Sequence, residues 1–350
     1  MATRTKEDLK MLQSLPLEIK VLKTQQRIRE WVDYYGTNGV YISFSGGKDS
    51  TVLLHIVREL YPDVEAVFVN TGLEYPEIQQ FVKTFDNVTI LRPKMRFDEV
   101  IKKYGYPIIS KDASGVIYEV LVRKAKGLDF TNLVRYQKLA GTHEHQGVKS
   151  PYCCEKYLPL INADFKTSNR CCHIMKKKPA HDFGKSSGKV AIVATMAEES
   201  RLRETSWIRS GCNAFEGKTP RSTPMAFWTE QDVLQYIKQH NIQMASVYGE
   251  VVFADNPEQI RFDGFESGRL TTSGCKRTGC IFCGFGCHLE KEPTRFQRLK
   301  ETHPKQYAYC IGGGEFNEQG IWQPSKEGLG MGYVFDRLNE IYGEGFIKYK

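Results

Sequence analysis

The sequence predicts an α/β fold, in which a doubly wound parallel sheet is followed by a cysteine-rich C-terminal region. Short apolar runs alternate with amphipathic stretches over the first hundred residues, and the connections between them are short. Such alternation favours right-handed βαβ units and hence a parallel sheet. A polar loop with two glycines follows the first apolar run, and most of the ten cysteines stand in groups. The sequence therefore predicts a ligand-binding sheet and a thiol-rich second part.

The predicted elements begin with an amphipathic leader. Apolar residues recur at helical spacing from Leu9 to Trp31, with a break at Pro16. A helix with an apolar face follows the polar loop, and another begins at Thr229-Glu230-Gln231-Asp232, which is typical of a capping box. Strands are predicted at residues 40–44, 66–69, 88–91 and 189–195, and helices at residues 77–84 and 229–240.

These elements indicate three domains along the chain. Residues 1–35 form the helical leader, residues 36–250 the nucleotide-binding α/β domain, and residues 251–350 a cysteine-rich C-terminal region. Residues 113–185 are rich in Lys, His and paired Cys and show weak periodicity, so we expect an insertion over the active face. The stretch 253–287 is rich in Gly and Cys, and the Gly-rich tail 312–350 shows no clear element.

Composition and charge exclude several classes of protein. Lys and Arg number 49 and Asp and Glu 41, a net charge of +8 that suits nucleic acid or a polyanionic nucleotide. The longest uncharged apolar run, residues 190–197, is far shorter than the roughly 18–20 residues of a membrane span. The N-terminus has no apolar stretch typical of a secretory signal. We therefore expect a soluble, cytoplasmic protein without a membrane partner.

The polar loop Ser45-Gly46-Gly47-Lys48-Asp49-Ser50 lies between a predicted strand and a predicted helix. Glycines allow a tight turn and close approach, and the amides at a helix N-terminus attract an anion. A Gly-rich turn capped by Ser and Asp is the simpler interpretation. The motif resembles the PP-loop of the ATP pyrophosphatase and sulfonucleotide reductase superfamily, the adenine nucleotide alpha-hydrolase-like fold. That resemblance implies binding of an adenine nucleotide.

Further segments resemble the phosphoadenosine phosphosulfate (PAPS) reductase family. Asn70-Thr71-Gly72-Leu73-Glu74-Tyr75-Pro76 is similar to its D-T-G-x-x-x-P segment, with Asn70 in place of Asp. Glu199-Ser200-Arg201-Leu202-Arg203 is similar to its Ser/Arg patch, and Trp228–Val233 to a segment that we take as structural. The resemblance implies Lys48, Asp49 and Arg201 as catalytic residues. The implied nucleotide-binding residues are Ser43, Ser45, Gly46, Gly47, Lys48, Asp49, Ser50, Asn70, Thr71, Gly72, Glu74, Ser200, Arg201 and Arg203.

The cysteines predict a metal or redox centre. An adjacent pair, Cys171-Cys172, and a distant C-x-x-C, Cys280 and Cys283, resemble the iron–sulfur (4Fe-4S) pattern of bacterial-type sulfonucleotide reductases. The resemblance places Lys176 beside the cluster, where an ammonium offsets its negative charge. Two alternatives stay open, a zinc site that also uses Cys275 and Cys287, and free or redox thiols. Cys153-Cys154 resembles the pattern less well.

The resemblance implies a sulfur-metabolism enzyme, and its two candidate reactions differ. In the first, ATP with Mg2+ activates an acceptor by AMP/pyrophosphate chemistry for sulfur transfer, with tRNA or DNA as acceptors. A cysteine desulfurase or thioredoxin-like protein would then be the sulfur donor. In the second, a reductase makes sulfite from adenylyl sulfate; its Glu-Cys-Gly-x-His motif is missing from residues 343–350. A non-catalytic nucleic-acid-binding protein with a zinc site is a third alternative.

Overall fold

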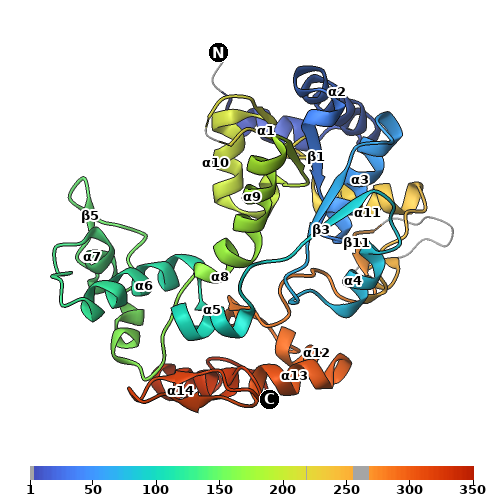
Figure 1. Cartoon of the computed structure of the whole chain (residues 1–350). Helices are drawn as coiled ribbons and strands as arrows, with labels where there is room; N and C mark the ends of the chain where they lie inside the picture. Colours follow the sequence, from blue (N-terminus) through green and yellow to red (C-terminus); the bar gives the residue numbers. More distant parts are fainter. Residues whose placement is uncertain (1–3, 218, 255–267) are drawn as a thin grey trace. The chain divides into compact units, whose positions relative to one another are not determined.

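The computed structural model describes residues 4–217, 219–254 and 268–350 (Figure 1). The chain forms two compact units that share the sequence in alternating segments. Unit 1 comprises Met1–Asn70, Glu74–Arg92 and Pro179–Gly279, and unit 2 comprises Thr71–Leu73, Pro93–Lys178 and Cys280–Lys350. Part of the predicted Gly- and Cys-rich stretch, residues 255–267, lies outside the described residues. Each unit is described separately.

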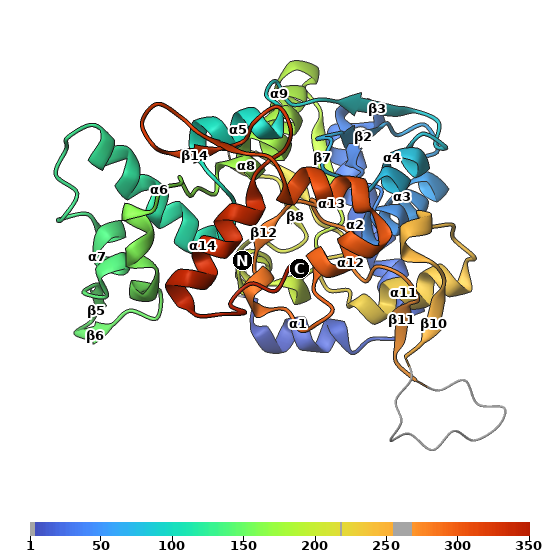
Figure 2. The ribbon, with the colours of Figure 1, turned by 90° about the horizontal axis from the view of Figure 1, so that it is seen from below.

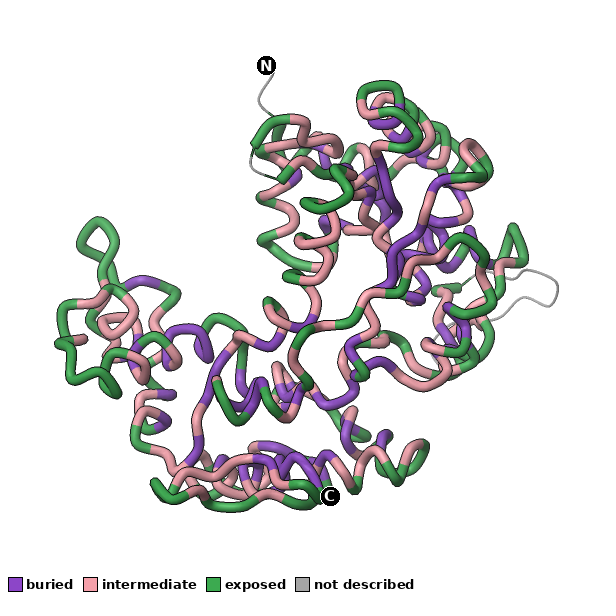
Figure 3. Tube along the Cα trace, viewed as in Figure 1, coloured by how far each residue is buried: buried purple, intermediate pink, exposed green. Residues whose placement is uncertain are grey.

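Unit 1 is built on a six-stranded sheet in the order β3-β2-β1-β7-β9-β8. Every neighbouring pair is parallel except β8 with β9. The central strand β1 has wholly buried residues, which Figure 3 shows in purple. The predicted parallel α/β sheet is therefore confirmed, with one short antiparallel strand at its edge. The strands are β1 (Val40–Ser43), β2 (Ala66–Val69), β3 (Val88–Leu91), β7 (Val190–Val193), β8 (Asn213–Ala214) and β9 (Arg221–Ser222).

The helices of unit 1 follow the predicted order. The leader breaks at Pro16 as predicted, and Thr229 and Asp232 form the predicted capping box. Strand β7 confirms the strand predicted at residues 189–195, and only Ile192 in it is fully buried. The helices are α1 (Lys6–Gln13), α2 (Leu17–Tyr35), α3 (Lys48–Leu60), α4 (Pro76–Val82), α9 (Lys178–Ser187), α10 (Arg201–Ser210) and α11 (Glu230–Gln239), and β10 (Val251–Phe253) pairs with β11 (Leu270–Thr272).

A buried ion pair joins the leader to α11. Lys20 Nζ lies 2.7 Å from an Asp232 carboxylate oxygen and donates to the Gln13 carbonyl at 2.6 Å. Beside it, Trp228 Nε1 donates to Thr24 Oγ1 at 2.8 Å. Such a pair is costly to break from one side, because the remaining charge stays buried without a partner. The leader therefore fixes the N-terminal end of α11.

Unit 2 contains more regular structure than its weak periodicity predicts. Over residues 113–178 the expected insertion holds the helices α6, α7 and α8, the short helical turns η2 and η3, and the hairpin β5–β6. The tail holds α14 (Figure 2), in which Val334, Phe335 and Leu338 are buried. The parallel pair β4–β12 joins Ile108 to Gly284 across the sequence. The elements are α5 (Phe97–Tyr104), β4 (Ile108–Ile109), α6 (Lys111–Ala125), α7 (Val134–Ala140), β5 (Glu144–His145), β6 (Val148–Lys149), η2 (Glu155–Asn162), α8 (Arg170–Cys172), the π-helical η3 (His173–Lys177), β12 (Gly284–Phe285), η6 (Cys287–Leu289), α12 (Arg295–Thr302), α13 (Pro304–Ile311), β13 (Glu315–Phe316), β14 (Trp322–Gln323) and α14 (Met331–Tyr342). No helix in the described parts of either unit combines the length and apolarity that a membrane crossing needs.

Candidate functional site

The phosphate loop turns sharply between β1 and α3. Gly46 has φ +70°, and a Cβ on it would lie 2.8 Å from methyl groups of both Ile78 and Val82. A side chain here would therefore meet unfavourable backbone geometry and a packed helix at once. The loop conformation depends on this glycine.

Serine hydroxyls hold the loop from inside. Ser50 Oγ accepts from the Ser45 amide at 3.1 Å, donates to the Gly47 carbonyl at 2.9 Å and lies 2.9 Å from Ser45 Oγ. Gly47 is the N-cap of α3 and offers no side-chain cap. Within the first helical turn, the amides of Asp49 and Ser50 are thus left for an anion, helped by the helix dipole.

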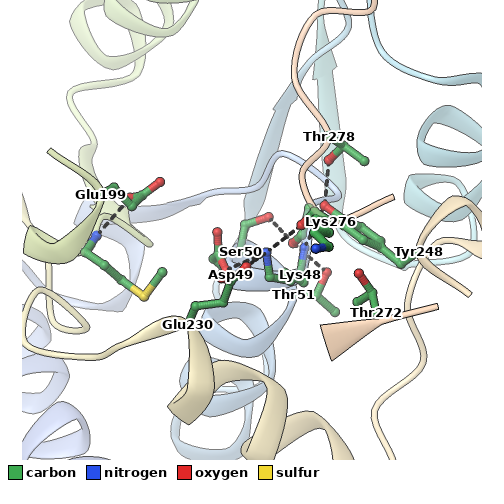
Figure 4. Close-up of polar contacts among 12 residues, drawn as sticks. Lys48, Asp49, Ser50, Thr51, Glu199, Glu230, Tyr248, Thr272, Lys276 and Thr278 are labelled. Carbon is green, nitrogen blue, oxygen red and sulfur yellow. Dashed lines mark hydrogen bonds and ion pairs between the residues drawn. The ribbon is translucent and has the colours of Figure 1, made fainter. Parts of the chain in front are cut away.

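Lys48 turns its side chain into the protein rather than exposing it to solvent. Its side chain is buried, and its Nζ lies 3.0 Å from Glu230 Oε1 and donates to the Lys276 carbonyl at 3.0 Å (Figure 4). Its own amide donates to Tyr248 Oη at 3.3 Å. Lys48 therefore links the loop to α11 and to the segment after β11, and its predicted catalytic role stays a prediction.

Asp49 stands among several charged groups. Burial raises its pKa, and the charges of Lys48, Arg277 and Arg203 lower it in part. Its Oδ1 is buried and has no hydrogen-bond partner. Arg203 forms an ion pair with Glu199, while burial and the neighbouring charge of Arg277 lower its pKa. Two guanidinium groups close enough to repel one another favour a bound anion between them.

Tyr248 and Thr278 complete the loop surroundings. Tyr248 Oη lies 2.6 Å from Thr278 Oγ1, and a Cβ built on Gly47 would come within 3.2 Å of that same Oη (Figure 4). The sequence reasoning missed Tyr248, Lys276, Arg277 and Thr278, and it assigned Glu230 only to a structural segment. The run Lys276-Arg277-Thr278-Gly279, two cations beside a glycine, was the available signal.

The other predicted nucleotide residues occupy different settings. Ser43 ends β1, Ser200 caps α10 by accepting from the Arg203 amide, and Asn70 Nδ2 donates to Gln79 Oε1 at 3.4 Å. Arg201 is exposed, and its guanidinium makes no hydrogen bond or ion pair with the described residues. Glu74 is buried in unit 1, and Thr71 and Gly72 belong to unit 2, where Thr71 Oγ1 accepts from the Leu73 amide. Their roles stay predictions.

Four thiols gather in unit 2. Cys171 Sγ and Cys172 Sγ lie 4.0 Å apart at the start of the π-helical turn. The pKa of Cys171 is raised by its hydrogen bond to Cys172, by burial, and by the nearby thiols of Cys283 and Cys280. The pKa of Cys172 falls to about 6, because Cys171 donates to it and the ammonium groups of Lys111 and Lys176 favour the thiolate. The structure thus brings the four predicted cysteines and Lys176 into one electrostatic environment.

Two cofactors could use these four thiols, a zinc ion and an iron–sulfur cluster. Over the described ranges, no three or more His, Cys, Asp or Glu side chains are arranged to hold a metal ion. A single zinc ion draws its thiolates to about 2.3 Å from one point, whereas a cubane cluster is a larger body that spaces them further apart. Arg295, which donates to the Cys283 carbonyl at 3.0 Å, adds a positive charge that suits an anionic cluster. The four thiols and the surrounding cations would suit either a thiolate-bound zinc ion or an anionic iron–sulfur cluster.

The remaining cysteines have other partners. Cys275 belongs to unit 1, where its Sγ donates to the Arg277 carbonyl at 2.8 Å. Cys287 donates to the Gly284 carbonyl at 3.0 Å, and burial raises its pKa to about 12. Cys153 Sγ donates to the His143 carbonyl at 3.5 Å, and burial raises the pKa of Cys154 to about 11.

The fold and the loop together define a class of protein. A Gly-Gly loop between a parallel strand and a helix N-terminus, with two arginines near its first helical turn, is the arrangement typical of a PP-loop fold. The chain belongs to the phosphoadenosine phosphosulfate reductase domain family, whose family model matches residues 39–110 and 145–284. The family resemblance seen in the sequence is therefore confirmed.

Known relatives place that membership in sulfur metabolism. An adenosine 5′-phosphosulfate reductase of Staphylococcus epidermidis is 25% identical over 222 residues, 63% of this chain and 69% of the relative. A sulfate adenylyltransferase subunit 2 of Pseudoalteromonas translucida is 24% identical over 261 residues, 66% of this chain and 73% of the relative. A crystal structure of phosphoadenylyl-sulfate (PAPS) reductase from Candida auris, as a phosphate complex, is 14% identical with a TM-score of 0.36, covering 70% of this chain and 91% of that one. Family and relatives place the chain among nucleotide-binding PP-loop enzymes of sulfur metabolism.

Proposed function

We propose that the chain binds ATP at Ser45–Ser50 and uses it to activate an acceptor for iron–sulfur-dependent sulfur transfer. The observation that carries this proposal is the loop itself. Helix α3 follows its N-cap Gly47 without a side-chain cap, and the charges of Arg203 and Arg277 act on Asp49 in its first turn. An acceptor oxygen attacks the α-phosphorus of ATP, and pyrophosphate leaves with its electron pair. A sulfide-level sulfur nucleophile then attacks the activated acceptor atom, and AMP leaves with the former acceptor oxygen and its electron pair.

Each residue of the loop has a role in this first step. The amides of Asp49 and Ser50 and the two guanidinium groups stabilise the negative charge that develops on the leaving pyrophosphate. Asp49 Oδ1, which is buried, accepts no hydrogen bond and lies 4.0 Å from Lys48 Nζ, is the oxygen that would hold the Mg2+ accompanying ATP. Lys48, bound to Glu230, acts as a positioning residue for the loop.

The thiols supply the second part of the proposal. Cys171, Cys172, Cys280 and Cys283 would hold a 4Fe-4S cluster, which supplies sulfur or electron chemistry when bound. Lys111 and Lys176 favour the thiolates needed for ligation. A sulfur-donor protein such as a cysteine desulfurase, and tRNA or DNA as acceptor, belong to this proposal.

Reduction of adenylyl sulfate to sulfite is the second candidate, favoured by the reductases among the relatives. That reaction needs a free thiolate to attack the sulfate sulfur. Among the six cysteines outside the proposed cluster, burial raises the pKa values of Cys154, Cys212, Cys287 and Cys310 and so disfavours the thiolate at each. The other two, Cys153 and Cys275, donate their thiol protons to backbone carbonyls. We therefore rank ATP activation first.

A product assay separates the candidates. Anaerobically purified protein receives either ATP or adenylyl sulfate, with a thiol reductant and with tRNA or single-stranded DNA. We expect acceptor-dependent release of pyrophosphate from ATP and no sulfite. Sulfite from adenylyl sulfate without pyrophosphate from ATP would establish the reductase, and turnover of neither would favour the non-catalytic alternative.

A further inference from the structure

Unit 2 contains a mostly apolar cavity of about 620 Å³. It lies between α5, α6 and the end of η2, with Ile321 from the segment before β14 closing one side. The segment that carries Ile321 is joined to the segment after η2 by the Trp322 amide, which donates to the Asp164 carbonyl at 2.6 Å. The ring and aliphatic lining comprises Tyr104, Tyr118, Leu121, Val122, Phe165 and Ile161.

Two tyrosines give the cavity flat faces. The ring centroids of Tyr104 and Tyr118 lie 6.2 Å apart with the planes tilted by 59°. Both side chains are half-buried, whereas Phe165 behind them is buried. Half-buried rings leave a face for a second π system, and a nucleobase stacks on such rings largely without regard to its sequence.

The charged lining carries a single sign. Lys103, Lys124 and Lys166 line the cavity, and none of the described lining residues is a carboxylate. Lys124 is held in place, since its Nζ donates to Asn162 Oδ1 at 2.7 Å. Neither Lys103 nor Lys166 has an ion-pair partner among the described residues, although Lys103 Nζ lies 5.4 Å from the Tyr104 ring centroid. Two ammonium groups beside an aromatic cavity match an aromatic ligand with phosphates.

Arg170 connects this cavity to the thiols within the same unit. Its guanidinium lies 6.0 Å from the Tyr104 ring centroid, and it directly precedes Cys171 in α8. Its Nε is buried and has no hydrogen-bond acceptor. Arg170 does not itself line the cavity, and its positive charge adds to the cationic surroundings of the Tyr104 ring.

We propose that this cavity binds one base of a single-stranded nucleic acid. Tyr104 and Tyr118 contact the base, and Lys103 and Lys166 contact the flanking phosphates. A fatty carboxylate would use one lysine and the aliphatic wall, but it would use neither the flat ring faces nor the second ammonium group. The binding site stands independently of the ATP reaction, and only its identification as the acceptor site rests on the proposed function.

The test is fluorescence anisotropy with labelled single-stranded DNA and RNA of about 12 nucleotides, within the usual site size of such proteins. The whole protein is titrated without ATP at several salt concentrations. We expect Tyr118→Leu to weaken binding about tenfold and Tyr118→Phe, which keeps the ring, to restore it. The double variant Lys103→Gln/Lys166→Gln should reduce the slope of log affinity against log salt by about 1.4.

Matched controls lie in unit 1. Tyr34→Leu removes an exposed ring, and Lys10→Gln/Lys83→Gln removes the same charge from exposed positions, so neither should alter binding at the cavity. Equal affinity in the Tyr118→Leu and lysine variants and in the controls would overturn the proposal, as would binding of dodecanoate without oligonucleotide binding. Pyrophosphate release is measured in parallel. If the wild type binds through the cavity but releases none, the cavity assignment survives and the proposed function fails.

Discussion

The phosphate loop of unit 1 and the thiol group of unit 2 are both proposed ligand sites, and their residues are arranged in different ways. The conformation of the loop is fixed by Gly46, by the hydroxyl of Ser50 and by the buried Lys48, without any ligand. The thiols of Cys171, Cys172, Cys280 and Cys283 influence one another's pKa values, yet the described residues contain no arranged metal site. The nucleotide site is therefore preformed, whereas the thiol site needs its ligand to complete it.

This difference follows from the chemistry of the two ligands. Backbone amides point at an anion whenever the loop and helix fold correctly, because their direction is fixed by the backbone. Thiols at the ends of flexible side chains repel one another once ionised, and only bound metal repays that cost. Preorganisation should therefore make nucleotide binding tolerant of cluster loss, and cluster binding intolerant of thiol loss.

The largest expected effect is at the thiols. Replacing Cys171 and Cys172 by Ser removes two of four ligands, so the brown colour should vanish and iron should fall from about four per chain towards zero. Iron and sulfide assays with an absorption spectrum measure this. Cys212→Ser, outside the proposed set, is the control and should keep full iron. Iron retained in the double serine variant would transfer the site to Cys275 and Cys287.

The second prediction concerns the buried ion pair between Lys20 of the leader and Asp232 of α11. Lys20→Met leaves Asp232 buried without its partner and should lower the free energy of unfolding by about 3–5 kcal/mol. Chemical denaturation followed by fluorescence measures the change. Lys10→Met on the exposed surface of α1 serves as the control. A loss below about 1 kcal/mol, the worth of a surface pair, would show that this ion pair does not hold α11.

The third prediction breaks the loop directly. Gly46→Ala places a methyl group against Ile78 and Val82 at an unfavourable φ, so ATP affinity should fall at least about tenfold. Calorimetry measures the affinity. Gly36 also has positive φ but open space around it and lies outside the implied nucleotide residues, so Gly36→Ala should leave ATP affinity unchanged. Equal affinities in wild type and Gly46→Ala would show that the loop does not bind the nucleotide.

The fourth prediction chooses between two arginines of one helix. Arg203 lies in the charged group around Asp49, whereas Arg201 is exposed. Removing a charge-assisted contact costs about 1.5–3 kcal/mol, so Arg203→Ala should weaken ATP binding roughly tenfold or more. Arg201→Ala should change it by less than about twofold. The reverse order would restore the role that the family resemblance implied for Arg201.

The smallest expected effect is a gain in stability. Burial raises the pKa of Asp49 in the folded protein. At acid pH the carboxyl is neutral and its burial costs little, whereas stability is lost as pH rises through the raised pKa and the buried carboxylate ionises. Asp49→Asn removes this cost and should stabilise the nucleotide-free protein by about 1 kcal/mol at pH 7 while abolishing Mg2+-dependent activity. Thermal unfolding measured from pH 4 to pH 8 should show the two proteins converging at the acid end. A difference that does not change with pH would contradict this origin.

The same comparison shows what could be predicted from the sequence. Four strands of the sheet (β1, β2, β3 and β7), the leader break at Pro16 and the loop Ser45–Ser50 were predictable because apolar periodicity and a local motif specify them. The short edge strands β8 and β9 were not predicted. The partners of Lys48 were not, because Glu230 and Lys276 meet it only through tertiary packing. The helices α5, α6 and α14 were missed as well, since their apolar residues pack on a core that short-range patterns do not show.

The most direct measurement is ATP affinity with and without the cluster. Calorimetry compares anaerobically reconstituted protein with protein stripped of iron by chelation, and Gly46→Ala is the negative control. The account predicts affinities that agree within about twofold for the first two and a fall of at least about tenfold for the third. ATP binding that disappears with the cluster, or that survives unchanged in Gly46→Ala, would contradict a preformed nucleotide site at Ser45–Ser50.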